Sequence, residues 1–249
     1  MKTQSGATLD WPRLLVLAVA LGLGVFFWHS PLLWPLKLLV VMMHESGHAL
    51  ATLFVGGRVD HIRIAADQSG QCLSYLPQGV FPKIAVYSAG YLGSTFAGAA
   101  MILLTYRYRL HRVVTAAAAV WLAVMTLFYV RDLFTAAFCV VTIAVLAACA
   151  KWLPDGPLDV LNLFIASFTA LYAVFDLRDD LWNPDVRAQS DAALLAAQTH
   201  VPAVVWAFLW SVFSLLILAA ALWLSVRGRA RPKAPRSALE EIQRLGRIR

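Results

Sequence analysis

The sequence predicts an all-α polytopic membrane protein with six or seven transmembrane helices. Of its 249 residues, 60% are hydrophobic and only 14% are charged, whereas a soluble domain has roughly half apolar and about a quarter charged residues. The apolar residues gather in runs long enough for a helix to cross a bilayer, which takes about 20 residues. The runs occupy residues 12–28, 32–55, 83–106, 113–130, 133–151, 157–175 and 201–226.

Two neighbouring runs leave the number of spans open. Only Arg131 and Asp132 separate residues 113–130 from residues 133–151, so these runs form either a tight helical hairpin or one bent element. We expect the run at 12–28 to be a retained span, because no small-residue cleavage site follows it. Residues 1–226 are therefore predicted to form one transmembrane domain.

Residues 227–249 are predicted to be a basic tail on the cytoplasmic side of the membrane. The tail carries eight Arg or Lys residues against two Glu residues, and such an excess marks cytoplasmic segments. Its last residues suit an amphipathic helix lying on the lipid bilayer. A second basic loop at residues 107–112 is expected on the same side. No nucleic-acid-binding motif accompanies these charges, and the short loops favour a bacterial plasma membrane.

Residues 56–76, between the second and third runs, are predicted to form a short β-hairpin. Residues 59–64 alternate roughly between apolar and polar side chains, residues 67–70 are typical of a turn, and residues 71–76 return. An exposed edge strand at this place could hold an extended peptide by strand addition.

The second run contains the motif His44-Glu45-Ser46-Gly47-His48. On a helix, this spacing puts two imidazoles one turn apart on one face, where both can bind one Zn²⁺. Glu45 can then accept a proton from a water bound to the metal. Ionisable groups inside a membrane are costly and usually functional, and Glu45 is the one Glu in the apolar part of the chain.

A carboxylate is the expected third zinc ligand. Catalytic zinc usually has three protein ligands and one open position, and no further His or Cys stands at a comparable place. Asp176 is the first choice because it ends an apolar helix, where an unpaired charge would be expensive. Asp180, one turn further on, and Asp191, at the predicted start of the next helix, are the alternatives.

Several segments together resemble one family of membrane enzymes. They are residues 44–49, 88–93, 171–181 and 190–192, with Thr199, Pro202, Trp206 and Trp210. These segments are similar to those of the M50B-like peptidases, a branch of the site-2 protease clan. In the wider clan the third ligand is an Asp in an Asp-Gly motif with Asn and Pro upstream. Here that pattern is reduced to the fragment at residues 154–157.

The resemblance implies an intramembrane zinc metalloprotease that cuts a membrane-anchored protein. The alternative is a non-proteolytic membrane scaffold or chaperone that retains the fold. Glu45 argues against the scaffold, because a scaffold has no need for a buried base. A transporter is disfavoured because the runs are nearly free of charge outside the motif and no internal repeat is found.

Overall fold

The computed structural model describes residues 30–182 and 190–226, and six separate positions before them. These positions are Leu15, Ala18, Val19, Gly22, Phe26 and Phe27. The expected span at 12–28 therefore lies largely outside the described residues, and the predicted tail at 227–249 lies outside them entirely.

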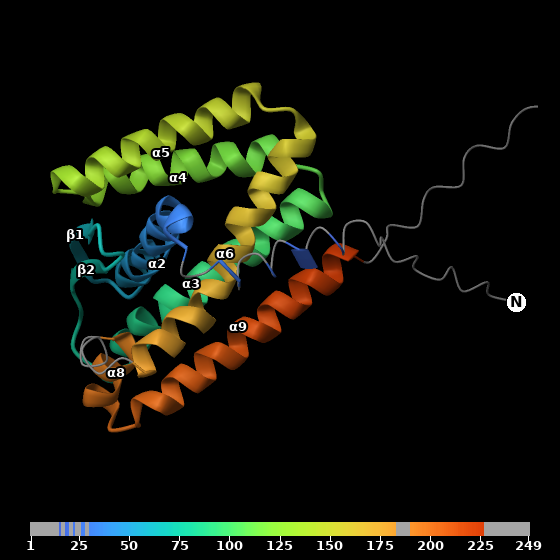
Figure 1. Cartoon of the computed structure of the whole chain (residues 1–249). Helices are drawn as coiled ribbons and strands as arrows, with labels where there is room; N and C mark the ends of the chain where they lie inside the picture. The colour runs from blue at the N-terminus through green and yellow to red at the C-terminus, as the bar shows by residue number, and fades with distance from the viewer. Residues whose placement is uncertain are drawn as a thin grey trace, which may run out of the picture.

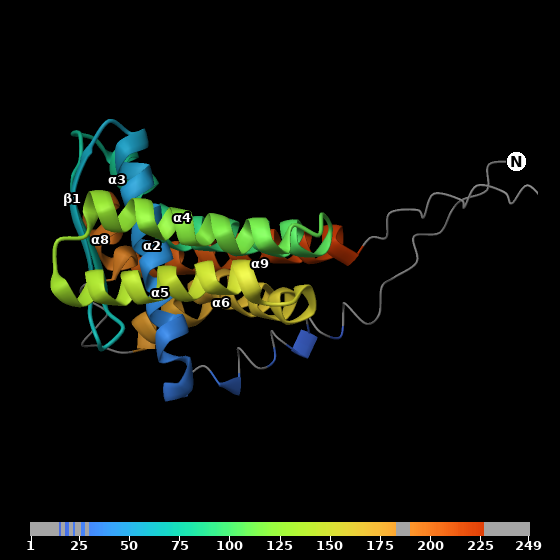
Figure 2. The same cartoon turned by 90° about the horizontal axis from the view of Figure 1, so that it is seen from above.

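The described part is helical apart from one β-hairpin (Figure 1). In chain order the elements are η1 (Pro31–Leu33), α2 (Trp34–Phe54), β1 (Arg58–Ile64), β2 (Gly70–Tyr75), α3 (Val80–Tyr106), α4 (His111–Tyr129), α5 (Leu133–Trp152), α6 (Asp155–Trp182), α8 (Asp191–Thr199) and α9 (Ala203–Val226). Helix α3 is central, because α2, α6, α8 and α9 all pack on it. Helix α2 runs across the direction of α4, α5 and α9 rather than along it (Figure 2).

Four described helices are long and apolar enough to cross a membrane, as expected for an integral membrane protein. They are α3, α4, α5 and α9. Large apolar side chains on their outer faces, such as Leu127, Leu133 and Phe208, are exposed, which suits contact with lipid. The runs at 32–55 and 157–175 also form helices, α2 and α6. Both helices carry ionisable residues, including those of the motif in α2, and neither is among the four. The described helices therefore do not establish six or seven spans.

The runs at 113–130 and 133–151 form two separate helices, α4 and α5, which pack side by side (Figure 1). Asp132 begins α5 by accepting a hydrogen bond from the backbone N–H of Thr135, a normal helix cap. At the other end, the Arg112 guanidinium donates to the carbonyls of Ala150 and Leu153, at 2.7 and 3.0 Å. The hairpin reading of these runs is correct.

The β-hairpin predicted after the motif helix is confirmed. Strands β1 and β2 pair antiparallel, with Ile62 opposite Cys72 and a bulge between Val59 and His61. Ile62 and Ile64 are buried on the inner face. The backbone of Ile64 exchanges hydrogen bonds with the Thr135 hydroxyl, so the hairpin is anchored to the start of α5 as well as to α2.

Two glycines bring α3 very close to its neighbours. A Cβ added at Gly47 of α2 would lie 2.3 Å from the Ala89 carbonyl oxygen of α3. A Cβ added at Gly98 of α3 would lie 2.5 Å from the Ala166 carbonyl oxygen of α6. Small residues permit such close helix packing in membranes, and here they set α2 and α6 directly against the central helix.

Replacement of Gly98 by alanine is expected to destabilise the fold by about 1–3 kcal/mol, the usual cost of overpacking. The methyl group would meet α6 backbone atoms, which cannot move without shifting the helix. Gly156→Ala is the matched control, because no atom lies within 4 Å of its added Cβ. The unfolding temperature in detergent checks this prediction, and an unchanged value for Gly98→Ala would contradict it.

Candidate metal centre

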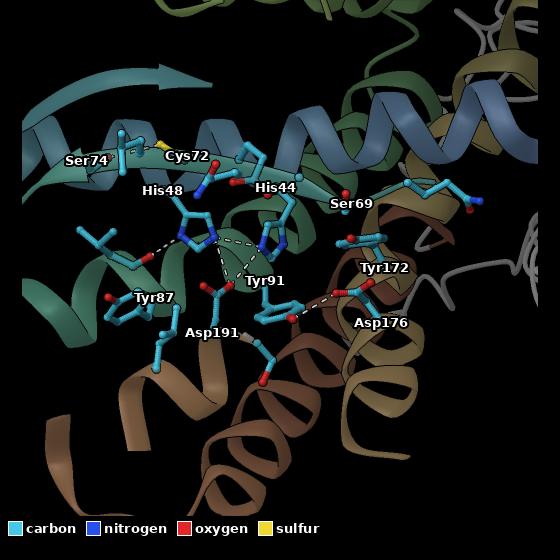
Figure 3. A pocket seen from close by; sticks show the side chains of 18 of the residues that line it. His44, His48, Ser69, Cys72, Ser74, Tyr87, Tyr91, Tyr172, Asp176 and Asp191 are labelled. Carbon is cyan, nitrogen blue, oxygen red and sulfur yellow. Dashed lines mark hydrogen bonds and ion pairs between the residues drawn. The ribbon is translucent and has the colours of Figure 1, made fainter. Parts of the chain in front are cut away.

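Helix α2 presents the two motif histidines on one buried face. His44 and His48 are one turn apart, and their Nε2 atoms lie 2.9 Å from each other. Both side chains are buried and point toward the space between α2, α3 and α8 (Figure 3). The close approach at Gly47, between the two histidines, holds this face of α2 against α3.

Asp191 completes a group of three ligand atoms. Ser190 caps α8 by accepting a hydrogen bond from the Ala193 N–H, and this places Asp191 in the first turn. One carboxylate oxygen of Asp191 lies 3.1 Å from Nε2 of His44 and 3.1 Å from Nε2 of His48. Burial alone would raise the pKa of this carboxyl, but the two imidazoles outweigh burial and hold the pKa well below its usual range.

The hydrogen bonding of His48 directs a nitrogen lone pair toward Asp191. The Nδ1–H of His48 donates to the Val86 carbonyl of α3 at 2.7 Å, so the neutral ring is unprotonated at Nε2. Metal-bound histidines are usually oriented by such a second hydrogen bond.

The three converging atoms fit a metal ion. Two imidazole nitrogens and a carboxylate oxygen lie within 4.8 Å of one another. Ligand atoms about 2.1 Å from a tetrahedral zinc lie about 3.4 Å apart, close to the separations seen here. Lone pairs that face each other at such distances repel, so the group needs a cation or protons between its members.

Gly90 of α3 forms the wall of this site. A Cβ added there would lie 2.4 Å from Nε2 of His44 and 2.5 Å from Nε2 of His48. Only a residue without a side chain leaves the ligand nitrogens open on this side. The small residues of α3 therefore pack on the motif helix and also shape the candidate metal centre.

Glu45 lies beside the three ligand atoms but is not one of them. Its side chain is buried and lines the same cavity as Cys72 of β2. A Cβ added at Gly70, also in β2, would lie 2.4 Å from a Glu45 carboxylate oxygen. Strand β2 therefore covers Glu45 directly, and the hairpin forms one wall of the site.

A cavity of about 900 Å³ joins these groups. Its walls include His44, Glu45, His48 and Asp191, residues 67–74 of the hairpin, and Tyr87, Tyr91, Tyr172 and Asp176. Cys72 also lines the cavity, but burial raises the pKa of its thiol to about 12. The thiol therefore stays protonated at neutral pH, and Cys72 is not part of the three-atom group.

The structure brings Asp191, rather than Asp176, against the two histidines. Asp176 lines the cavity, but its carboxylate accepts a hydrogen bond from the Tyr91 hydroxyl at 3.1 Å. The backbone of Asp180 belongs to α6, but its side chain is not part of the described structure. Our preference for Asp176 as third ligand is therefore revised in favour of Asp191, one of the two alternatives.

Three aromatic residues of the site were missed from the sequence. The rings of Tyr91 and Tyr172 contact the imidazole of His44, and the ring of Trp210 stacks on Tyr91. All three belong to the segments that carry the family resemblance, so that resemblance was the signal available.

Comparison with known proteins gives one match. A family model described as Peptidase M50B-like matches residues 15–221, which include both histidines, Glu45 and Asp191. No curated protein and no solved structure matches the chain.

Replacement of Gly90 by alanine is expected to lower zinc affinity by a factor of about 100 or more, because the methyl group would force both imidazoles to turn away. Gly93→Ala, one turn along α3, is the matched control, since the nearest atom to its added Cβ is the Gly47 Cα at 3.5 Å. Competition with a chelator in detergent measures the affinity. Parent-like zinc binding by Gly90→Ala would count against this site.

Proposed function

Because the chain belongs to the M50B-like peptidase family, we propose that it is an intramembrane zinc metalloprotease that hydrolyses a membrane-anchored protein. The observation that carries this proposal is the convergence of His44, His48 and Asp191 beside Glu45 in one cavity. Family membership supports a peptidase with a protein substrate in a membrane, and the four apolar helices agree with that setting.

In the proposed site, His44, His48 and Asp191 hold the zinc ion. Two histidines and one carboxylate are a recognised set of ligands for catalytic zinc. When bound, zinc supplies a Lewis acid that lowers the pKa of water and polarises the peptide carbonyl. Val86 keeps His48 in the tautomer that this role requires, and Gly90 keeps both ligand nitrogens accessible.

Glu45 is the proposed general base. It accepts a proton from the attacking water and later donates it to the leaving amine. Its position supports this role, because the carboxylate follows His44 on α2 and faces the same cavity without joining the ligand group. Strand β2 packs directly against the carboxylate at Gly70.

Strand β2 is the proposed docking edge for the substrate. Among the described residues the sheet has only two strands, so one edge of β2 has no strand beside it. Every residue of β2 from Gly70 to Ser74 lines the cavity. A peptide added to this edge would be extended, as cleavage of a transmembrane helix requires, because a hydrogen-bonded helix hides its carbonyls.

We also propose that residues 1–226 form a single membrane domain with six or seven spans, and that the tail at 227–249 is cytoplasmic. In support, the Arg107 guanidinium at the basic loop donates to the Leu224 carbonyl at the end of α9, at 3.1 Å. The loop and the C-terminal end of α9, which the tail follows in the sequence, therefore lie at one end of the molecule. Short loops favour a bacterial plasma membrane as its location.

Glu45→Gln is expected to retain zinc and to reduce cleavage by a factor of about 10²–10⁴, the usual loss when a general base is removed. Asp191→Asn should lose both zinc and cleavage, because the variant lacks an anionic ligand. The assays are zinc content and processing of a membrane-anchored reporter that the parent chain cleaves. Parent-like cleavage by Glu45→Gln would refute the protease mechanism and favour a non-proteolytic scaffold.

Topology reporters fused after Arg109 and after Arg249 should both report the cytoplasmic side. The reason is that basic residues concentrate in both segments. Fusions that report opposite sides would overturn the proposed topology without affecting the metal centre.

A further inference from the structure

His44 and His48 differ in the contacts that set the orientation of their imidazole rings. Metal-bound histidines usually donate their second N–H to a neighbouring acceptor, which sets the ring orientation. His48 does so through Val86. Among the described residues, Nδ1 of His44 is buried without a hydrogen-bond partner. The orientation of His44 therefore depends on something other than a hydrogen bond at Nδ1.

Two tyrosine rings flank His44. The Tyr91 ring lies edge-on to the imidazole, with centroids 4.5 Å apart at 76°. The Tyr172 ring makes a similar contact at 5.4 Å and 70°. Edge-to-face contacts of this kind are favourable and depend on angle, so they oppose rotation of the imidazole (Figure 3).

Tyr91 is itself held from two further sides. Its ring stacks on Trp210 of α9 at 5.2 Å, and its hydroxyl donates to Asp176 of α6 at 3.1 Å. The side chain is buried. Residues of α6 and α9 therefore both contact Tyr91 of α3, and Tyr91 in turn faces His44 of α2.

We propose that Tyr91, locked by Asp176, is a positioning residue that holds His44 in its zinc-binding orientation. The inference rests on the proposed zinc site. It gives the two cavity aspartates separate tasks: Asp191 ligates, and Asp176 supports a ligand through Tyr91. It also accounts for a carboxylate at the cavity wall that is not in the three-atom group.

Zinc affinity of the full chain in detergent, measured by chelator competition, tests the proposal. Tyr91→Phe keeps the ring but removes the hydroxyl, and Asp176→Ala removes the acceptor. Each should weaken zinc binding about tenfold, the lower end of the range for residues that support ligands. The double variant should bind zinc as tightly as the single variants, because the two substitutions remove the same hydrogen bond. Asp176→Asn retains an acceptor oxygen and should stay close to the parent.

A second measurement separates positioning from general stability. In the Co²⁺-substituted protein, Tyr91→Phe and Asp176→Ala should alter the visible absorption bands, which report ligand geometry. Tyr129→Phe on α4 is the matched control and should change neither the bands nor the affinity. A purely structural role for Tyr91 would lower the unfolding temperature and leave the bands of the folded protein unchanged, which would overturn the proposal.

The remaining outcomes identify which claim has failed. If the parent binds zinc through His44, His48 and Asp191 but Tyr91→Phe binds it equally well, the positioning role is wrong and the zinc site stands. If Asp176→Asn loses zinc while Tyr91→Phe keeps it, Asp176 is a ligand and the inference is overturned. If the parent binds no zinc, the proposed function fails together with the inference.

Discussion

The central constraint on this structure is the gathering of two imidazoles and two carboxylates in one cavity of a largely apolar chain. Such groups are expensive away from water unless they are paired or bind a cation. His44, His48 and Asp191 converge on one point with their lone-pair atoms about 3 Å apart. A divalent cation would relieve that repulsion and satisfy all three side chains. The surrounding elements are arranged so that these atoms remain together.

Each neighbouring element contributes to that arrangement in a different way. Gly47 and Gly90 let α2 and α3 approach so closely that the imidazoles lie against the α3 backbone. The hairpin covers Glu45 and leaves an edge of β2 facing the cavity. Helices α6 and α9 reach the site through Asp176 and Trp210, which hold Tyr91. The candidate ligand group and the proposed docking edge therefore lie in one cavity.

Sequence reasoning was most successful where one local pattern carried the chemistry. The spacing of His44 and His48 on a helix, the hairpin after it and the apolar helices were all predicted from the chain, because periodicity and motif spacing are local properties. The third ligand depends on tertiary structure. Asp176 ends an apolar run and Asp191 begins a helix, and no local pattern tells which carboxylate lies near the histidines. The contacts of Tyr91 could not be predicted for the same reason, since its partners come from three other helices.

A zinc-edge anomalous difference map of the purified protein tests the central claim most directly. The account predicts one strong peak between His44, His48 and Asp191, about 2.0–2.2 Å from each ligand atom, with Glu45 beyond bonding distance. A peak bonded to Asp176 instead of Asp191, or zinc bound only elsewhere in the chain, would contradict the account.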